Sequence, residues 1–316
     1  MERECDRRTF LKTSLAASTG LGLATSGGFI ARTVTGATGL PTKATTPLPM
    51  RALGKTGRQV TIYGLGGLFT VSMHDRHNEA VEIVNRAIDL GVNYIDTSAW
   101  YGTGASELNI GTVMKGRRDE VFLASKSHEY TYDGTMALFE QSLRRLQTDH
   151  IDLYQHHLLG GLGQLQQLQQ PHSARQAFER LRDEGRIRYI GVTGHSSRVL
   201  ADALEDYPYD CALITLNAAG EVMDDPDHLD RFFRVARDRQ VGVIAMKVVA
   251  RGALIERGLD IRQLLPYALS HPISTAIVGI STVAHLDENV RIASAFEPLS
   301  KEEMAEIRAA AKSRSG

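Results

Sequence analysis

Residues 80–102 read AVEIVNRAIDLGVNYIDTSAWYG and contain one complete helix-to-strand unit. In the first half, apolar side chains recur at helical spacing along one face, while charged and amide side chains occupy the other. Gly91 is typical of a helix end, and residues 92–96 form a short apolar run that predicts a strand. Polar and aromatic residues follow this run directly, at positions 97–102. The stretch therefore predicts a helix, a turn and a buried strand whose end carries reactive groups.

The same alternation continues through the rest of the chain. Apolar runs rich in Val, Ile and Leu are separated by segments with helical spacing, which is typical of parallel strands buried on both faces. The eight runs cover residues 60–65, 92–96, 121–125, 151–156, 189–193, 212–216, 241–246 and 275–280. Each unit takes about 29 residues, a length sufficient for a βα crossover. Strict alternation over eight units favours an α/β fold of the closed (β/α)8 TIM barrel type over an open doubly wound sheet.

Two glycine-containing segments precede the second unit. Residues 63–67 read YGLGG, but the third glycine of a dinucleotide-binding fingerprint is missing and no helix follows at once, so we interpret them as a turn at the barrel mouth. Residues 50–57 read MRALGKTG and predict a short N-terminal hairpin that closes the bottom of the barrel, with Lys55, Thr56 and Gly57 as its turn.

The composition excludes several classes of function. The 316 residues include 36 Lys and Arg against 37 Asp and Glu, so the net charge of -1 gives no electrostatic reason to expect binding to nucleic acid or an acidic membrane. Cys5 and Cys211 are the only cysteines, and the histidines are scattered, so we expect neither a disulfide framework nor a bound metal.

The N-terminus carries a targeting pattern. Arg7 and Arg8 are followed by Phe10, Leu11 and Lys12, and then by a run rich in Ala, Gly, Ser and Thr that is too weakly apolar for a stable membrane span. The pattern resembles a twin-arginine export signal, which implies that the twin-arginine translocase carries the folded protein to the periplasm. We expect a signal peptide over residues 1–37, a linker over 38–50 and the barrel over 51–316.

Four reactive side chains follow three neighbouring strands: Asp96, Tyr101, Lys126 and His157. Each has a structural explanation when taken alone, such as helix capping, packing or solvation. Together they suit proton transfer to an oxyanion, because a lysine lowers the pKa of a nearby tyrosine and a carboxylate keeps that lysine charged. The carboxyl ends of barrel strands meet at one mouth, so we expect the four groups to converge there.

The order of motifs resembles that of the aldo-keto reductases. The matching pieces are Leu53 to Gly57, Gly64 to Gly66, Asp96 to Gly102, Ser106 with Glu107, Ile110 with Gly111, Lys126, Ile151 to His157, Gly185 to Val192, Arg251 to Leu254, and Glu288 with Asn289. The resemblance implies a TIM barrel that binds NADP(H) and reduces a small aldehyde or ketone. It assigns Tyr101 as general acid, Lys126 and Asp96 as its support, and His157, five residues after Asp152, as the group that orients the carbonyl.

The resemblance also implies cofactor and substrate contacts. The expected dinucleotide contacts are Thr193, Asn217, Lys247, Arg251, Gly252, Leu254, Gly279, Ser281, His285 and Asn289. Typical members place Ser-Asn and Gln around the nicotinamide, whereas this chain has Thr193-Gly194 and Leu213. Residues 281–290, which follow the last strand, contain no arginine for a 2′-phosphate. NAD(H) therefore remains an alternative to NADP(H). Trp100 is the expected aromatic wall for the substrate.

Two other functions use the same residues. One alternative is a dinucleotide-binding sensor or regulatory module with little turnover. The other is a barrel aldolase in which Lys126 forms a Schiff base, although this leaves Tyr101 and the end of the last strand without a role.

Overall fold

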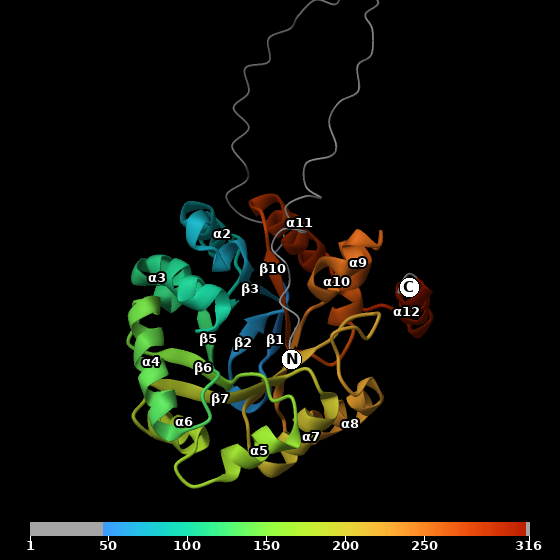
Figure 1. Cartoon of the computed structure of the whole chain (residues 1–316). Coiled ribbons are helices and arrows are strands. Elements are labelled where there is room, and N and C mark those ends of the chain that lie inside the picture. Colours follow the sequence, from blue (N-terminus) through green and yellow to red (C-terminus); the bar gives the residue numbers. More distant parts are fainter. Residues whose placement is uncertain (1–46, 314–316) are drawn as a thin grey trace, which may run out of the picture. The chain divides into compact units, whose positions relative to one another are not determined.

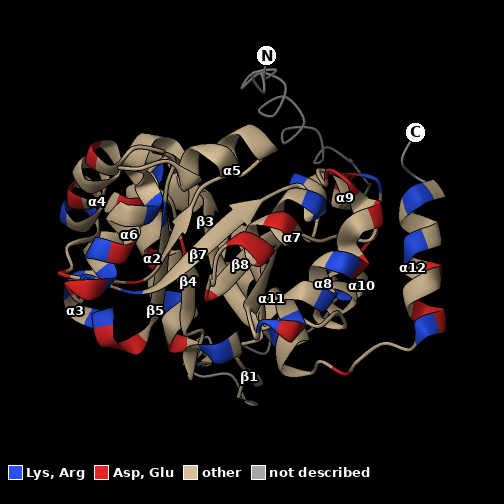
Figure 2. Cartoon of the chain, turned by 90° about the horizontal axis from the view of Figure 1, so that it is seen from below, with Lys and Arg blue, Asp and Glu red and all other residues tan. Residues whose placement is uncertain are grey.

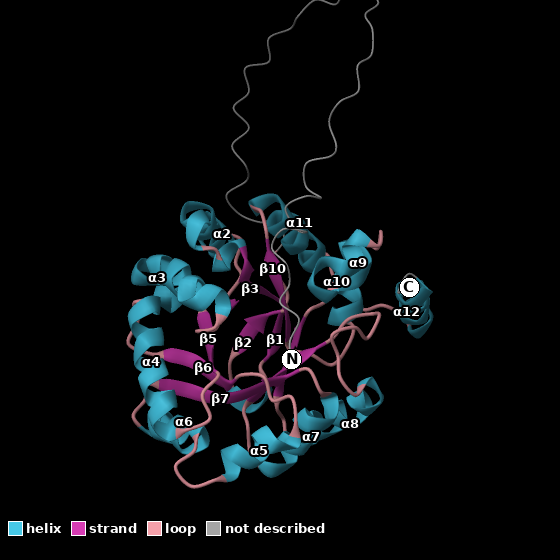
Figure 3. Ribbon diagram, in the orientation of Figure 1, coloured by secondary structure: helices cyan, strands magenta, loops and turns pink. Residues whose placement is uncertain are grey.

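The computed structural model describes residues 47–313. Within this range, eight parallel strands close into a barrel in the order β10-β3-β4-β5-β6-β7-β8-β9, and helices surround it (Figure 1 and Figure 3). The strands are β3 (Tyr63–Phe69), β4 (Tyr94–Asp96), β5 (Phe122–Ser127), β6 (Ile151–His156), β7 (Ile187–Gly194), β8 (Cys211–Thr215), β9 (Gly242–Met246) and β10 (Thr275–Ile280). The eight-unit barrel inferred from the alternation is confirmed.

Helices occupy the segments between the strands. They are α2 (His77–Asp89), α3 (Ala105–Arg117), α4 (Tyr132–Leu146), α5 (Leu162–Gln169), α6 (Ala174–Asp183), α7 (Ser197–Asp206), α8 (Leu229–Asp238), α9 (Ala253–Glu256), α10 (Ile261–Leu269), α11 (Val283–Ser294) and α12 (Lys301–Ser313). In α2, the buried residues recur on one face, as the spacing of residues 80–90 predicts.

The first barrel strand differs from the prediction. Residues 59–61 belong to the hairpin as β2 (Gln59–Thr61), and the barrel strand β3 begins two residues later and continues to Phe69. The proposed turn at residues 63–67 is therefore wrong, because its glycines lie inside β3. Close packing requires glycine at these positions. A Cβ on Gly66 would lie 3.0 Å from the Gly279 nitrogen, and a Cβ on Gly64 would lie 3.0 Å from the Tyr94 ring. These glycines let neighbouring strands and side chains approach inside the barrel.

The hairpin predicted for the bottom of the barrel is present. Strand β1 (Met50–Ala52) pairs antiparallel with β2. The Arg51 guanidinium donates to the carbonyls of Ile273 and Leu269 at 2.8 and 2.9 Å, which ties the hairpin to the segment before β10. Leu53 is fully buried in the barrel interior. Gly54 has φ +53, and a Cβ there would lie 2.2 Å from the Gly242 nitrogen, so this close approach requires glycine.

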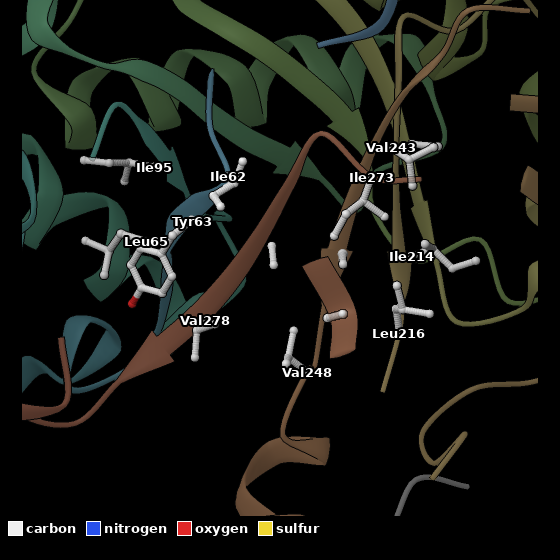
Figure 4. Packing of buried hydrophobic residues seen from close by; sticks show 14 of the residues in the cluster. Ile62, Tyr63, Leu65, Ile95, Ile214, Leu216, Val243, Val248, Ile273 and Val278 are labelled. Carbon is white, nitrogen blue, oxygen red and sulfur yellow. The ribbon is translucent and has the colours of Figure 1, made fainter. Parts of the chain in front are cut away.

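Strand residues alternate between two apolar clusters. Leu153, Leu213 and Ile244 belong to the cluster inside the barrel, whereas their neighbours Tyr154 and Ile214 face the helices. Figure 4 shows part of the outer cluster, with Tyr63, Leu65, Ile95, Ile214 and Val243 among its labelled members. The alternation decides which polar residues at the strand ends point into the mouth.

Most of the charged residues belong to the helices around the barrel (Figure 2). Across residues 47–313, no helix combines the length and apolarity that crossing a bilayer would need. The predicted export signal and most of the predicted linker lie outside the described residues.

Candidate active site

The structure brings the four predicted reactive residues together at the carboxyl ends of β4, β5 and β6. Asp96 ends β4, Lys126 lies in β5, and both are fully buried. The Lys126 ammonium forms an ion pair with the Asp96 carboxylate and donates to the Thr97 carbonyl at 2.7 Å. Although burial disfavours the charged form, Asp96 and Tyr101 together raise the pKa of Lys126 above its usual value. An ammonium with a raised pKa suits electrostatic stabilisation of a neighbouring anion and argues against Lys126 as a Schiff-base nucleophile, which must lose its proton.

Tyr101 begins the short turn after β4 and packs against this ammonium. Lys126 Nζ lies 4.8 Å from the centre of the Tyr101 ring. Burial raises the pKa of the Tyr101 phenol above its ordinary value, and the Lys126 charge offsets only part of this shift. The net direction differs from the lowered pKa expected from the sequence, because burial outweighs the neighbouring cation. The phenol therefore keeps its proton at neutral pH and remains available as a donor.

His157 follows β6 and faces the same mouth. Its Nδ1 lies 3.2 Å from the Ser98 hydroxyl, and its ring meets the Tyr101 ring edge-on with centroids 5.8 Å apart. Burial, followed by the Lys126 charge, lowers the pKa of His157 to about 2, so the imidazole is neutral. His156 points to the opposite side and stacks on Phe178 with centroids 4.0 Å apart. His157, the histidine that the family resemblance selects, thus lies beside Tyr101, whereas His156 packs on the helix side.

Two further polar groups support these residues. Gln155 faces the barrel interior and donates from Nε2 to Asp96 Oδ2 at 3.2 Å. Ser98 accepts from the Trp100 backbone N–H at 3.2 Å as well as contacting His157. The alternation along β6 would have identified Gln155, because it lies two residues before His157. Ser98 has no such signal, since it lies in a loop.

The loop after β9 is held in a conformation that most side chains avoid. Lys247, Ala250 and Arg251 have φ values of 58, 48 and 62. Each non-glycine residue in this region costs about 1 to 3 kcal/mol and persists only where its surroundings enforce it. Lys247 Nζ lies 2.7 Å from His195 Nε2, a contact between two loops that the sequence did not predict.

Two predicted nicotinamide contacts lie near the ends of β7 and β8. Thr193 is buried near the end of β7 and pairs in register with the interior residue Leu213. The Asn217 side chain is hydrogen-bonded to backbone groups. Its Nδ2 donates to the carbonyls of Glu221 and Lys247 at 2.8 and 3.3 Å, and its Oδ1 accepts from the Glu221 N–H. These bonds use both amide donors of Asn217, which favours a structural role for it.

The loop after β9 carries four more predicted contacts. Arg251 is exposed, and Gly252 is half-buried with open space where a Cβ would stand. Leu254 is fully buried, and its backbone N–H bonds to the Val249 carbonyl at 3.4 Å. Lys247 and Arg251 are therefore the groups of this loop that have charge to offer a ligand.

The last predicted contacts surround the junction between β10 and α11. Thr282 caps α11 by accepting from the His285 N–H at 3.3 Å. Ser281 is half-buried and His285 exposed, whereas Asn289 is buried. Gly279 is explained by packing, since a Cβ would lie 2.5 Å from the Phe69 ring. A strand that leads into the first turn of a helix is suited to a phosphate, because the N–H groups there point outward.

Apolar side chains accompany the reactive groups on the segments that follow the strands. Trp100 is 51% exposed, and its ring lies 5.6 Å from that of His157 and 5.4 Å from that of His128. Other exposed large apolar side chains are Met73 in the loop after β3, Leu162 on α5 and Ile255 on α9. The exposed Trp100 ring beside His157 suits the organic part of a small molecule.

Other polar features are separate from this group. A surface hollow on the outer side of the barrel is lined by Glu140, Leu143, Arg144, Gln147, Thr148 and Asp149, none of which belongs to the reactive set. Over residues 47–313, no group of three or more His, Cys, Asp or Glu side chains is arranged to hold a metal ion.

Comparisons with known proteins agree with this architecture. The model of the aldo/keto reductase family matches residues 62–264. L-galactose dehydrogenase of Arabidopsis thaliana is 28% identical, over 84% of this chain and 94% of its own. An aldo-keto reductase of Bacillus halodurans in its holo form is 26% identical, with a TM-score of 0.68 over 83% of this chain and 96% of its own. An aldo/keto reductase of Klebsiella pneumoniae, solved in complex with NADP and acetate, is 26% identical, with a TM-score of 0.65 over 82% of this chain and 94% of its own.

Proposed function

The chain belongs to the aldo/keto reductase family, and from this premise we propose that it reduces aldehydes or ketones to alcohols with NADPH as hydride donor. Tyr101 is the general acid in this proposal. The observation that carries it is the convergence of Tyr101, Lys126, Asp96 and His157 at one barrel mouth, with the Lys126 ammonium 4.8 Å from the phenol ring.

The barrel mouth fits a dinucleotide. The capped first turn of α11, with Ser281 and His285 beside it, provides backbone and side-chain donors for a phosphate. Thr193, buried near the end of β7, is a polar group that suits another part of the molecule. When bound, NADPH supplies the hydride that the carbonyl carbon receives. The complex of the Klebsiella relative with NADP supports this cofactor. Residues 281–290, directly after β10, contain no arginine, which keeps NADH as the alternative to be measured.

The side chains supply the remaining chemistry. The neutral imidazole of His157 can donate to the carbonyl oxygen and orient it toward Tyr101. As charge develops on that oxygen, Tyr101 transfers its proton to it. Lys126 then stabilises the phenolate, and Asp96 keeps the lysine charged. The Lys126 ammonium therefore stabilises the Tyr101 phenolate more than it stabilises the neutral phenol.

Turnover and binding measurements test this proposal together. The purified protein is mixed with NADPH or NADH and a panel of aldehydes and ketones, and the nicotinamide absorbance is followed. We expect carbonyl-dependent oxidation of NADPH and tighter binding of NADPH than of NADH in fluorescence titrations. A protein that binds the dinucleotide tightly but turns over no carbonyl would instead match the sensor alternative.

Export is a second part of the proposal and rests on the N-terminal sequence. The motif Arg7-Arg8 followed by Phe10, Leu11 and Lys12 suits the twin-arginine translocase, and a folded barrel is the kind of cargo that this route carries. The test is cell fractionation followed by mass spectrometry of the N-terminus. Periplasmic protein that begins near residue 38 is expected, and replacing both arginines with lysine should retain it in the cytoplasm. A periplasmic chain that still began at Met1 would contradict the proposed cleavage.

A further inference from the structure

Lys247 and His195 form a pair at the barrel mouth that the reduction chemistry above does not use. His195 follows β7 and Lys247 follows β9, and Lys247 Nζ lies 2.7 Å from His195 Nε2. Since an ammonium has only donors, the imidazole nitrogen accepts. A weaker contact joins Nζ to Met246 Sδ at 3.3 Å. These contacts use two of the three N–H groups of the ammonium, so one donor remains for a ligand.

The pair lies in a region of excess positive charge. Arg251 is close enough to act on both Lys247 and His195. Among residues 47–313, no carboxylate forms an ion pair with Lys247 or Arg251, and the nearby Asp96 is already paired with Lys126. A half-buried ammonium without a counter-charge is costly unless a ligand supplies that charge.

The backbone holds these groups in place. The Lys247 carbonyl accepts from the Asn217 side chain at 3.3 Å and from the Ala250 N–H at 2.8 Å. Lys247, Ala250 and Arg251 all have positive φ, an arrangement that suits a functional loop better than a passive one.

The position of the pair relates it to the reacting carbonyl. The Lys247 charge acts on both His157 and Asp96. Because β7 and β9 belong to the same parallel barrel as β4 to β6, the pair follows strand ends at the mouth that holds these residues. The phosphates of a dinucleotide are the other source of negative charge at this mouth, and they are the use that the sequence suggested for Lys247.

The geometry points to an anion subsite formed by Lys247 and His195, with Arg251 beside it, which binds the carboxylate of an oxo-acid substrate. This inference rests on the proposed carbonyl reduction and narrows its substrates to carbonyl compounds that carry a carboxylate. The exposed Trp100 ring would contact the carbon chain between the two groups.

The wild-type protein provides the first test. 4-Oxobutanoate and butanal have the same number of carbons and differ in the carboxylate, and the methyl ester of 4-oxobutanoate controls for its oxygen atoms. We expect kcat/KM with NADPH to be about tenfold or more higher for the acid than for butanal, with the ester close to butanal. Equal values for the acid and butanal would overturn the inference.

Variants identify the residues and the source of the anion. Lys247→Met should remove most of the preference for the acid, and His195→Gln should weaken it if Lys247→Met does not fold. Lys55→Met, in the turn of the hairpin at the other end of the barrel, controls for the loss of a lysine and should keep the preference. If Lys247→Met weakens NADPH binding and lowers kcat/KM equally for 4-oxobutanoate and butanal, the pair binds a dinucleotide phosphate and the inference is wrong.

A binding measurement separates this inference from the proposed function. If neither aldehyde is turned over, the proposed reduction fails, and the subsite is then tested by titrating 4-oxobutanoate and butanal into the protein with NADPH bound, following its fluorescence. Tighter binding of the acid that is lost in Lys247→Met supports the subsite. Equal binding of both compounds overturns it.

Discussion

Lys126 Nζ lies 4.8 Å from the centre of the Tyr101 ring while it is ion-paired with Asp96 and donates to the Thr97 carbonyl at 2.7 Å. One ammonium thus connects a buried carboxylate to a phenol. Burial favours the neutral phenol, and the ammonium favours the phenolate. This opposition suits a residue that must hold a proton at rest and release it during a reaction.

Removing the phenol hydroxyl tests the assigned acid. We expect Tyr101→Phe to lower kcat/KM for carbonyl reduction by about 10²- to 10⁴-fold, the usual contribution of a positioned general acid. Dinucleotide affinity, measured by fluorescence titration, should stay near that of the wild type because the ring is retained. Wild-type turnover in this variant would show that another group donates the proton.

Removing the buried cation tests the ion pair. Lys126→Met leaves the Asp96 carboxylate buried without its partner, and we expect a loss of about 3 to 5 kcal/mol in the free energy of unfolding. The double variant Asp96→Asn with Lys126→Met should recover much of this loss because it contains no buried charge. Urea unfolding measures the free energy of unfolding of the single and the double variant. Equal stabilities of the single and double variants would mean that the carboxylate is not the cause.

The charge state of His157 can be measured directly. Burial, followed by the Lys126 charge, lowers the pKa of His157 to about 2. We therefore expect the assigned ring signals of His157 in nitrogen-15 spectra to remain those of a neutral imidazole from pH 8 down to pH 5. A transition near the ordinary histidine value would show that the ring is more solvated than its packing against Trp100 and Tyr101 indicates.

The buried ammonium of Lys247 should make stability depend on pH. Burial, followed by the charges of Arg251 and Lys126, lowers its pKa to about 7, whereas an unfolded lysine titrates near 10.4. Between these values the unfolded chain binds more protons, so this residue makes stability rise with pH. Below pH 7 both states are charged, and the folded protein carries the full cost of burying the ammonium.

Lys247→Met removes that cost. The variant should therefore have a higher Tm than the wild type at pH 6, and the difference should shrink by pH 9. Thermal unfolding at the two pH values measures this. A variant that is less stable than the wild type at pH 6 would contradict the depressed pKa and assign Lys247 a stabilising role.

The hairpin should contribute stability without touching the chemistry. Leu53 is fully buried in the barrel interior, so Leu53→Ala should cost about 2 to 5 kcal/mol in unfolding free energy while kcat changes little. Leu108→Ala on α3, where the side chain is 44% exposed, is the matched control and should change stability by about 0.5 kcal/mol or less. A large fall in kcat for Leu53→Ala would mean that the bottom of the barrel influences its mouth.

The strand and helix periods predicted most of the architecture because they follow local rules. Residues 151–156 and 275–280 match β6 and β10 in both bounds, since apolar runs bounded by polar residues are local signals. Residues 60–65 were misassigned because one apolar run serves two elements, the hairpin strand β2 and the barrel strand β3. Only pairing with β1 on one side and β10 on the other separates them.

In the candidate site, too, some features follow from the sequence and others only from the tertiary structure. The sequence by itself determined the eight-unit barrel and predicted that Asp96, Tyr101 and Lys126 follow its strand ends, because strand ends are local signals. The family resemblance selected His157. The tertiary structure decided that burial outweighs Lys126 at the Tyr101 phenol, that Asn217 binds its own loop, and that Lys247 meets His195. These outcomes depend on burial and on contacts between residues far apart in the chain, which no local pattern encodes.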